Sequence, residues 1–515
     1  MKKALISAIA CLLTVTLVLG LAACGTKPDS NSNSNNNSNN TSSSTAADDH
    51  LIVVAKGLPI SMDPHDSSDM NTAYVCHQIY DTLFRLTAKD YTVEPSLAES
   101  YDTPDAQTLN IKLREGVKFH NGDLLTADIV KASLHRTMES AHVGYIVAMV
   151  DDITVHDDLN LTIKLNVPFA PILNNLAHYG TAIVHPDASH EKPIGTGAFK
   201  FDSIALGDKV ELSRNDDYWG VKSEISKLTW RAMPEATNRL IEVESGNAHL
   251  AYDISPSDVA RVEAASNLVL NKATSLAAHY LGMHCQKPPF DDIRVRHAIN
   301  YAIDIETLSK TAYEGTGKPG TGAITEVVTY AYPIDPWPYD VEKAKQLMAE
   351  AGLEDGFDIM LWYNTEDQQY AQMATMIQNM LKEINVNATI QSFEWATYLD
   401  RVLGGEQEMF LLSWITLTGD ADYGLFETQH SSEFGNGNLV FYGDEQRDKL
   451  LEEGRAHLDP NERREIYQEI AEMIHEASAY IYLHHGEELH ATTANLKGFE
   501  VSPSGMFDLW KTHIE

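Results

Sequence analysis

The chain has 515 residues, with 38 Lys and Arg against 74 Asp and Glu, and a formal net charge of −36 at pH 7. This acidic excess disfavours nucleic acid and anionic lipid as electrostatic partners, because both attract clustered Lys and Arg. Its 43% apolar and 22% charged residues are typical of a folded globular protein, and the length predicts roughly three structural units.

The first 23 residues are predicted to be a secretory signal. Two lysines precede an apolar stretch over residues 4–23, and small residues precede Cys24. The end of this stretch, Leu21-Ala22-Ala23-Cys24-Gly25, resembles the lipobox of bacterial lipoproteins. The resemblance implies that Cys24 is diacylated, becomes the new N-terminus and anchors the protein in the cell membrane, on its outer face. A retained transmembrane helix is the alternative.

A polar stretch follows the lipobox. Every residue from 30 to 45 is Ser, Asn or Thr, which predicts a flexible tether over 24–48, since this composition cannot bury apolar surface. The folded part is expected to begin near Asp49. It contains two cysteines, Cys76 and Cys285, and the sequence does not decide between a disulfide and two buried free thiols.

The rest of the chain alternates strand-like and helix-like segments, which predicts an α/β protein. Strands are expected at 51–55, 109–113, 161–165 and 409–414, and helices at 341–351, 370–384 and 460–477. Asp340 and Asp459 stand where N-caps are expected, and Pro460 suits the first position of a helix.

The search for catalytic and metal motifs gives little. Residues 315–320 spell GxGxxG, but Pro319 stands where a nucleotide-binding helix would start, and the sequence has no GxxxxGK[ST], GxSxG or HExxH motif. His484, His485 and His490 are the best metal candidates, although a solvated or interface histidine cluster explains them better. We therefore expect no enzymatic activity, no cofactor and no metal site.

Four segments carry a resemblance to one family. They read SMDPH at 61–65, LREGVKFHNG at 113–122, PIGTGAF at 193–199 and PFDDIRVRHAINYAID at 289–304. In this order they resemble the family 5 extracellular solute-binding proteins of ABC importers, which carry peptides, glutathione, nickel chelates and related solutes. The resemblance covers the chain from about residue 50 to the end.

The resemblance implies an α/β, two-lobed, periplasmic-binding-protein-like fold of type II, in its larger three-domain form, with a hinge between the lobes. Lobe I would comprise 49–90, 192–283 and 490–515, the inserted domain 91–191, and lobe II 284–489. The solute would be enclosed between the lobes by hinge closure.

The segment 413–426 is expected to contact the solute, because it is a strand that ends in a polar loop. In peptide-binding members an Asp three residues after the Trp that matches Trp414 pairs with the ligand's α-ammonium. Leu417 stands at that position here, and Asp420 or Asp422 could substitute or could instead cap a helix. The predicted cleft residues are Met62, His284, Trp395, Tyr398, Trp414, Thr416, Leu417, Thr418, Gly419, Asp420, Asp422 and Tyr423. The aromatic ones would fit a core equally well.

In function, the resemblance implies a monomeric binding lipoprotein that captures a short peptide or peptide-like solute, of the oligopeptide or glutathione type. It would deliver this solute to the permease subunits of an ABC importer and would have no nucleic-acid partner. A nickel or other metal chelate is the alternative cargo within the same family. An anchored hydrolase is a third hypothesis, which the missing nucleophile and metal motifs disfavour.

Overall fold

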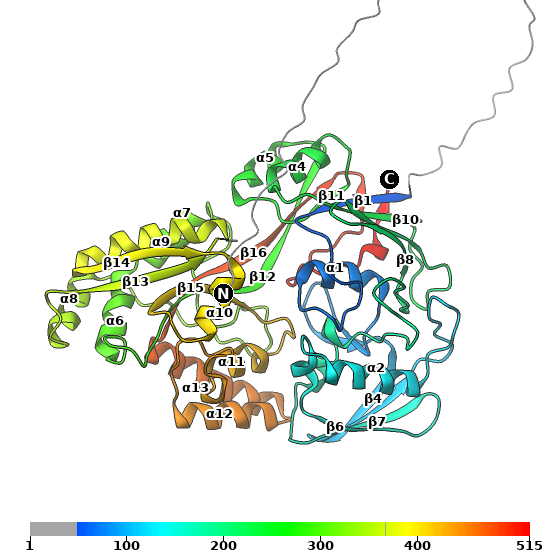
Figure 1. Cartoon of the computed structure of the whole chain (residues 1–515), viewed down its shortest axis with the longest axis horizontal. Helices are drawn as coiled ribbons and strands as arrows, with labels where there is room; N and C mark the ends of the chain where they lie inside the picture. Colours follow the sequence, from blue (N-terminus) through cyan, green and yellow to red (C-terminus); the bar gives the residue numbers. More distant parts are fainter. Residues whose placement is uncertain (1–48, 366) are drawn as a thin grey trace, which may run out of the picture. The chain divides into compact units, whose positions relative to one another are not determined.

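Ten strands form one mixed sheet in the order β14-β13-β15-β12-β16-β11-β1-β10-β9-β8 (Figure 1). The computed structural model describes residues 49–365 and 367–515, all within the unit Ala47–Glu515. The predicted signal, Cys24 and the tether lie outside the described residues. Two long strands, β12 (Leu268–Met283) and β16 (Tyr480–Thr493), pair antiparallel at the centre of the sheet.

One half of the sheet contains β1 (His50–Ala55), which pairs parallel with its neighbours on both sides. The other strands of this half are β8 (Phe199–Ala205), β9 (Lys209–Arg214), β10 (Lys227–Ala232) and β11 (Leu250–Ala251). Its helices are α1 (Met70–Ile79), α4 (Ala236–Glu244) and α5 (Val259–Ala264). Trp230 and Phe199 are fully buried in the core between α1 and these strands.

The other half contains β13 (Phe357–Asn364), β14 (Val386–Phe393) and β15 (Met409–Ile415). Its helices are α6 (Ile293–Ala302), α7 (Ile305–Ala312), α8 (Val341–Glu350), α9 (Gln368–Leu381), α10 (Trp395–Leu403), α11 (Ala421–Gln429), α12 (Glu445–Ala456) and α13 (Pro460–Ala477). Successive residues of β15 pack on opposite faces: Leu411 lies in the cluster with helices α6 to α9, and Leu412 in the cluster with α10. This alternation follows from the two-residue period of a strand.

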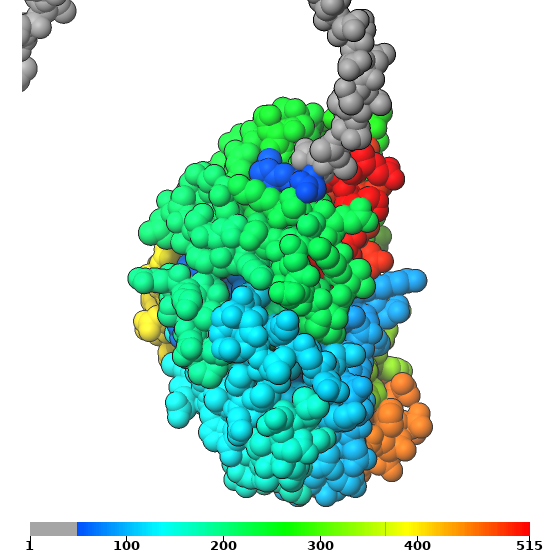
Figure 2. Space-filling view, turned by 90° about the vertical axis from the view of Figure 1, so that its right-hand side faces the viewer, coloured from blue at the N-terminus to red at the C-terminus, as the bar shows by residue number. Residues whose placement is uncertain are grey.

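A separate antiparallel sheet, β4-β5-β7-β6, lies within the predicted inserted domain. Its strands are β4 (Ala98–Asp105), β5 (Thr108–Leu113), β6 (Val150–Val155) and β7 (Asn160–Leu165), accompanied by α2 (Ala127–Glu139) and α3 (Ile172–Asn175). In Figure 2 this segment, in cyan, adjoins the green segment that carries β8 to β10. The amide of His120 donates to the carbonyl of Gly195, which joins the two segments (2.9 Å).

Two small two-stranded sheets complete the strands of the described residues. The first pairs β2 (Phe84–Leu86) with β3 (Val93–Pro95), and the second pairs β17 (Leu496–Lys497) with β18 (His513–Ile514). Short 3-10 turns lie at Gly144–Val147, Tyr179–Thr181, Pro256–Asp258, Lys382–Ile384, Ser431–Glu433 and Leu509–Lys511.

The helix ends follow the capping residues of the sequence. Asp340 accepts the amide of Lys343 at the start of α8, and Asp459 caps α13, whose first residue is Pro460. The predicted helix 460–477 is confirmed over its full range, and each of the seven predicted elements overlaps an observed helix or strand. The predicted helix 370–384 begins two residues early, at Gln368, and its last three residues form a 3-10 turn.

The two cysteines of the described residues are free thiols, both buried, which decides the question that the sequence left open. Cys76 lies in the core beside α1, and Cys285 follows the end of β12. Burial raises the pKa of the Cys285 thiol to about 11, so the reactive thiolate is disfavoured.

The domain bounds predicted from the sequence stay predictions. The two central strands, β12 and β16, each pair with strands on the other side of a predicted bound. Strand β12 lies within 192–283 but pairs with β15 along residues 277–283. Strand β16 crosses the predicted bound at residue 490 and pairs with β11 at its end. Both halves of the large sheet are therefore joined by continuous strands. No helix among the described residues is long and apolar enough to cross a membrane.

Candidate functional site

Strand β15 ends at Ile415 in a buried turn that leads into α11. Gly419 has φ +70° within this turn, a conformation that an L side chain rarely adopts. The carbonyl of Gly419 accepts a hydrogen bond from the amide of Thr329 (2.9 Å). The carbonyl of Thr329 accepts one from the amide of Ala421 (3.2 Å). A neighbouring segment of the same half therefore holds the turn from both sides.

The other side of the turn contacts residues 91–191. The Tyr91 hydroxyl donates to the carbonyl of Leu417 (2.8 Å), and the Asn174 amide donates to the carbonyl of Thr418 (2.8 Å). The hydroxyls of Tyr145 and Tyr423 lie 3.2 Å apart. We call these contacts the seam, because they join the predicted inserted domain to the predicted lobe II.

One further seam contact involves Arg455 on α12. Its carbonyl accepts the amide of Ala170 (2.7 Å), and its guanidinium lies over the rings of Phe169 and Phe426, 5.4 and 3.2 Å from their centroids. Cation–π attraction of this kind is strengthened where water is excluded. The seam thus continues from the turn along α11 to α12.

Both aspartates of the segment already have arginine partners. Asp420 accepts two bonds from Arg463, at 2.6 and 2.8 Å, and Asp422 accepts two from Arg455, at 3.0 and 3.1 Å. Asp420 also caps α11 by accepting the amide of Asp422 (3.0 Å), so the helix-cap alternative holds for Asp420. Burial raises the pKa of Asp422, and Arg455 opposes this shift.

The residues before the aspartates divide between core and seam. Leu417 packs against the apolar cluster that contains Tyr91. Trp414 is half-buried with its ring 5.8 Å from that of Tyr423, and its indole N–H has no hydrogen-bond partner among the described residues. The hydroxyl of Thr416 is buried and likewise without a partner there. Both polar groups are buried, so each is a polar atom of the core without a partner among the described residues.

Four other predicted cleft residues lie elsewhere. Tyr398 is fully buried and donates to the carbonyl of Leu411 (2.6 Å), and Trp395 stacks on it from the surface. Met62 is fully buried in the core beside α1. His284 stacks on Phe441 and follows β12, whose last residue pairs with the first of β15. His284 is therefore at the opposite end of this strand pair from the turn.

Sequence reasoning missed the residues that approach the turn from other segments. These are Tyr91, Tyr145 and Asn174. Their separation from the turn along the chain, 326 residues for Tyr91 and Leu417, leaves no local pattern that could have revealed them. Only the positive φ of Tyr91 marks an unusual backbone position, and a single sequence does not show it.

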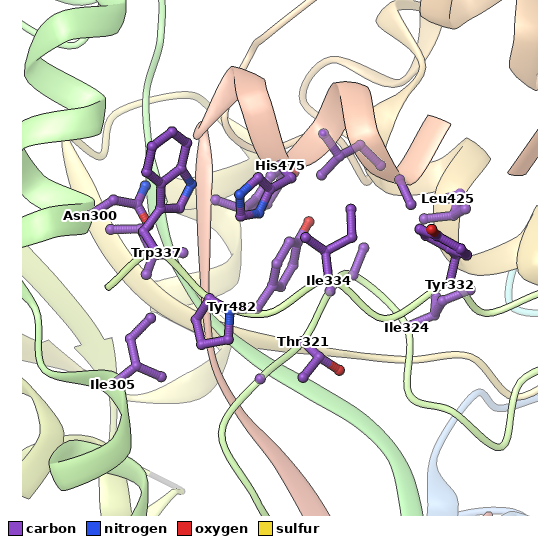
Figure 3. A pocket seen from close by; sticks show the side chains of 18 of the residues that line it. Asn300, Ile305, Thr321, Ile324, Tyr332, Ile334, Trp337, Leu425, His475 and Tyr482 are labelled. Atoms are coloured by element: carbon purple, nitrogen blue, oxygen red, sulfur yellow. The ribbon is translucent and has the colours of Figure 1, made fainter. Parts of the chain in front are cut away.

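Two hollows lie in the described part of the chain near these elements, and Tyr91 of the seam lines one of them. One, with about 740 Å³ of empty space, is lined by α1, Tyr91, Tyr179 and the segment 502–510. The other, with about 630 Å³, is formed within residues 300–482 and is mostly apolar. Figure 3 shows Ile305, Ile324 and Ile334 around this second hollow, with Trp337 beside His475. The second hollow lies within the predicted lobe II rather than at the seam.

The histidines near the end of the chain take part in packing. His484 stacks on Tyr313, with ring centroids 3.6 Å apart, and shares a hydrogen bond with the Ser309 hydroxyl (2.8 Å). Burial lowers the pKa of His484 to about 2, and the ring of His485 bonds the carbonyl of Gly322 (2.9 Å). Within residues 49–365 and 367–515, no group of three or more His, Cys, Asp and Glu could hold a metal ion.

Comparison with known proteins identifies the fold. The model of "Bacterial extracellular solute-binding proteins, family 5 Middle" matches residues 92–436. The glutathione-binding protein GsiB of Salmonella typhimurium is 32% identical over 480 residues, which cover 88% of this chain and 93% of GsiB.

Solved structures agree. The periplasmic binding protein DppA from Helicobacter pylori, in complex with the peptide STSA, has a TM-score of 0.80 at 28% identity over 90% of this chain and 98% of its own. NikA from Staphylococcus aureus, in complex with Ni(L-His)2, has a TM-score of 0.77 at 25% identity over 90% of this chain and 100% of its own. The expected type II α/β fold is confirmed by these likenesses, and the chain belongs to the family 5 bacterial extracellular solute-binding proteins.

Proposed function

We propose that this chain is the solute-binding lipoprotein of an ABC importer and that it captures a short peptide or peptide-like solute, of the oligopeptide or glutathione type. The observation that carries this proposal is the seam, where the turn after β15 meets Tyr91, Tyr145 and Asn174. The glutathione-binding GsiB and the peptide complex of DppA, both similar over most of their length, support the solute class.

The strand arrangement supports capture by hinge closure. Strands β12 and β16 run through both halves of the large sheet, so bending within them would move the halves relative to each other. A solute that contacts both sides of the seam binds the closed form better than the open form and shifts the population toward it. Affinity would come mainly from main-chain hydrogen bonds with the solute. Few side chains in the sequence would then indicate which solute is bound.

A metal chelate is the second candidate cargo, supported by the likeness to NikA in complex with Ni(L-His)2. The histidines His484 and His485 offer it little, because both are engaged in packing contacts. An anchored hydrolase is the least supported hypothesis. The protein is proposed to act as a monomeric binding protein without a catalytic step.

Native mass spectrometry of the purified protein tests the solute class. Co-purification of a peptide or glutathione mass is the expected result, confirmed by calorimetric titration with glutathione and with alanine peptides of two to five residues. A nickel chelate mass, or binding of Ni(L-His)2 alone, would contradict the proposal in favour of the second cargo. Turnover of an added peptide would contradict it in favour of a hydrolase.

The lipobox-like end of the signal supports a lipid anchor on the outer face of the membrane, from which the loaded protein would reach the permease. Two acyl chains suffice for stable anchoring. We expect that wild-type protein incorporates radiolabelled palmitate and fractionates with membranes, whereas Cys24→Ala does neither. Cys11→Ala, which alters a cysteine within the predicted signal, is the matched control and should keep the label. Labelling of Cys24→Ala would contradict the assignment.

A further inference from the structure

The hollow within residues 300–482 has the composition of a ligand site. It contains about 630 Å³ of empty space, part of it open to solvent. Among the described residues, no Asp, Glu, Lys or Arg lines it, and six of the residues that do are Tyr330, Tyr332, Trp337, Tyr467, Tyr480 and Tyr482. Sites for small molecules are typically concave, with mostly apolar and aromatic walls and few polar groups.

One long loop forms much of the wall. The segment 313–340, between α7 and α8, contains no helix or strand, and it lines the hollow along 320–324 and again between 330 and 337. Ordered loops of this length are uncommon in compact domains and are usually functional. The amides of Lys318 and His485 each donate to the carbonyl of the other, at 3.1 and 2.9 Å, which fastens the loop to β16.

The wall contains a buried hydrogen-bond donor without a partner. Trp337 lines the hollow, and its indole N–H is buried and has no hydrogen-bond partner among the described residues. The indole is held in place by His475, which stacks on it with centroids 5.0 Å apart, and by Tyr301, edge-on at 5.1 Å. A buried donor without a partner is costly, so a ligand that supplies an acceptor oxygen here makes a hydrogen bond that the protein alone lacks.

The groups around the hollow favour a neutral molecule. The guanidinium of Arg463 already lies over the rings of Tyr330 and Tyr467, so these two ring faces are not available to a cationic ligand. An anion would find no Lys or Arg in the described wall. Burial lowers the pKa of His475, so this ring is also neutral at pH 7.

We infer that this hollow is a second ligand site, for a small neutral molecule with a compact apolar body and one acceptor oxygen, and that Trp337 donates to this oxygen. Figure 3 shows Trp337 at one end of the hollow and Tyr332 at the other. Because Tyr332 is 39% exposed, the ligand enters at its end. The inference does not depend on the proposed function, since the hollow lies within the predicted lobe II and not at the seam.

Cyclohexanone and methylenecyclohexane are matched probes, because the carbonyl oxygen of the first is replaced by a methylene group in the second. Heteronuclear NMR follows the indole N–H signals of the seven tryptophans, and the Trp337 signal is the one that Trp337→Phe removes. Cyclohexanone should shift this signal in a saturable way. It should also bind wild type about 2- to 10-fold more tightly than methylenecyclohexane, which is the range of one neutral hydrogen bond.

Two variants separate the hydrogen bond from the hollow itself, with both affinities measured by ligand-detected NMR. Trp337→Phe should abolish the preference for cyclohexanone, since it removes the donor and keeps an aromatic ring. Ala471→Leu, on the α13 side of the wall, should abolish the binding of both probes, because the larger side chain fills the space. Ala349→Leu, at an exposed position of α8, is the matched control and should leave both affinities unchanged.

Three results would overturn the inference. The first is the absence of a saturable shift of the Trp337 signal, and the second is equal affinity of wild type for the two probes. The third is displacement of cyclohexanone by glutathione or by the alanine peptides, because it would place the probe in the solute cleft. None of these results bears on the proposed function, which the peptides and glutathione test directly.

Discussion

Asp420 has two roles in one side chain, as cap of α11 and as partner of Arg463. The guanidinium of Arg463 is enclosed by the rings of Tyr330 and Tyr467, 4.6 and 5.4 Å from their centroids. Both members of the pair are nearly inaccessible, with side chains 3% and 5% exposed. A buried pair of this kind adds little stability over an apolar pair, but breaking it leaves one charge without a partner.

Asp420→Asn should therefore lower the free energy of unfolding by about 3–5 kcal/mol, since Arg463 would remain buried and charged. Urea denaturation followed by circular dichroism measures the loss. Asp355→Asn, at an exposed position, is the control and should change stability by less than about 0.5 kcal/mol. A loss for Asp420→Asn as small as that of the control would show that the ion pair is dispensable.

The surroundings of Leu417 explain why an apolar residue stands at this position. Its side chain packs against the cluster of Tyr91, Ile324 and Val328, so an aspartate at 417 would face apolar side chains. The structure thus assigns the arginine-paired Asp420 and Asp422 to the support of α11. The family pattern alone would have suggested residue 417.

Among the elements, α11 contributes Tyr423 and Phe426 to the seam. Its first turn contributes Tyr423, which approaches Tyr145 from the 3-10 turn Gly144–Val147, and the two rings stack with centroids 6.4 Å apart. Since the two residues belong to different predicted domains, their contact depends on how these domains meet. Such a contact is expected to affect closure more than the folding of either domain.

Tyr145→Phe and Tyr423→Phe should each weaken solute binding by about 2- to 10-fold, because a neutral hydrogen bond contributes about 0.5–1.5 kcal/mol. The double variant should lose no more than either single variant, since both remove the same bond. Titration with the co-purified solute gives the four affinities. Additive losses would mean that the hydroxyls act separately, and Tyr101→Phe, on the exposed face of β4, serves as control.

The fold elements that could be predicted are those whose signals are local. The helix 460–477 was fully predictable because Asp459, Pro460 and an amphipathic period lie within one short stretch. The 16-residue strand β12 was not predicted, because it changes neighbours along its length and so lacks one continuous pattern of burial. Its pairing with β16 shifts register between Thr274 and Ala278.

The whole molecule has a net charge of −36, and one of its carboxyl groups, that of Glu427, is held in the neutral form by burial. Burial raises the pKa of Glu427 on α11 to about 7, with Glu433 and Asp422 adding to the shift and Arg455 opposing it. Tyr145 and Tyr423 also lie close enough to feel its charge. Between the unfolded pKa of about 4.3 and 7, the folded chain binds this proton and the unfolded chain does not.

The contribution of Glu427 to stability therefore falls as the pH rises through this window, by up to about 4 kcal/mol. Glu427→Gln should match wild type near pH 5 and be the more stable protein at pH 8. Urea denaturation of both proteins at four pH values measures the difference between their free energies of unfolding. The contributions of the other titrating groups cancel in this difference. Glu383→Gln, at an exposed position, should show a difference that does not vary with pH, and the same behaviour in Glu427→Gln would contradict the assignment.

The sequence by itself determined the α/β class, the family and the local elements, because periodicity, caps and motifs express interactions between residues close together in the chain. It also pointed to the turn after β15. Only the tertiary structure decided which groups meet there. The pairing of Asp420 with Arg463, the approach of Tyr91 to Leu417 and the contact of Tyr145 with Tyr423 depend on strand register and domain contacts, which join residues that no local pattern connects.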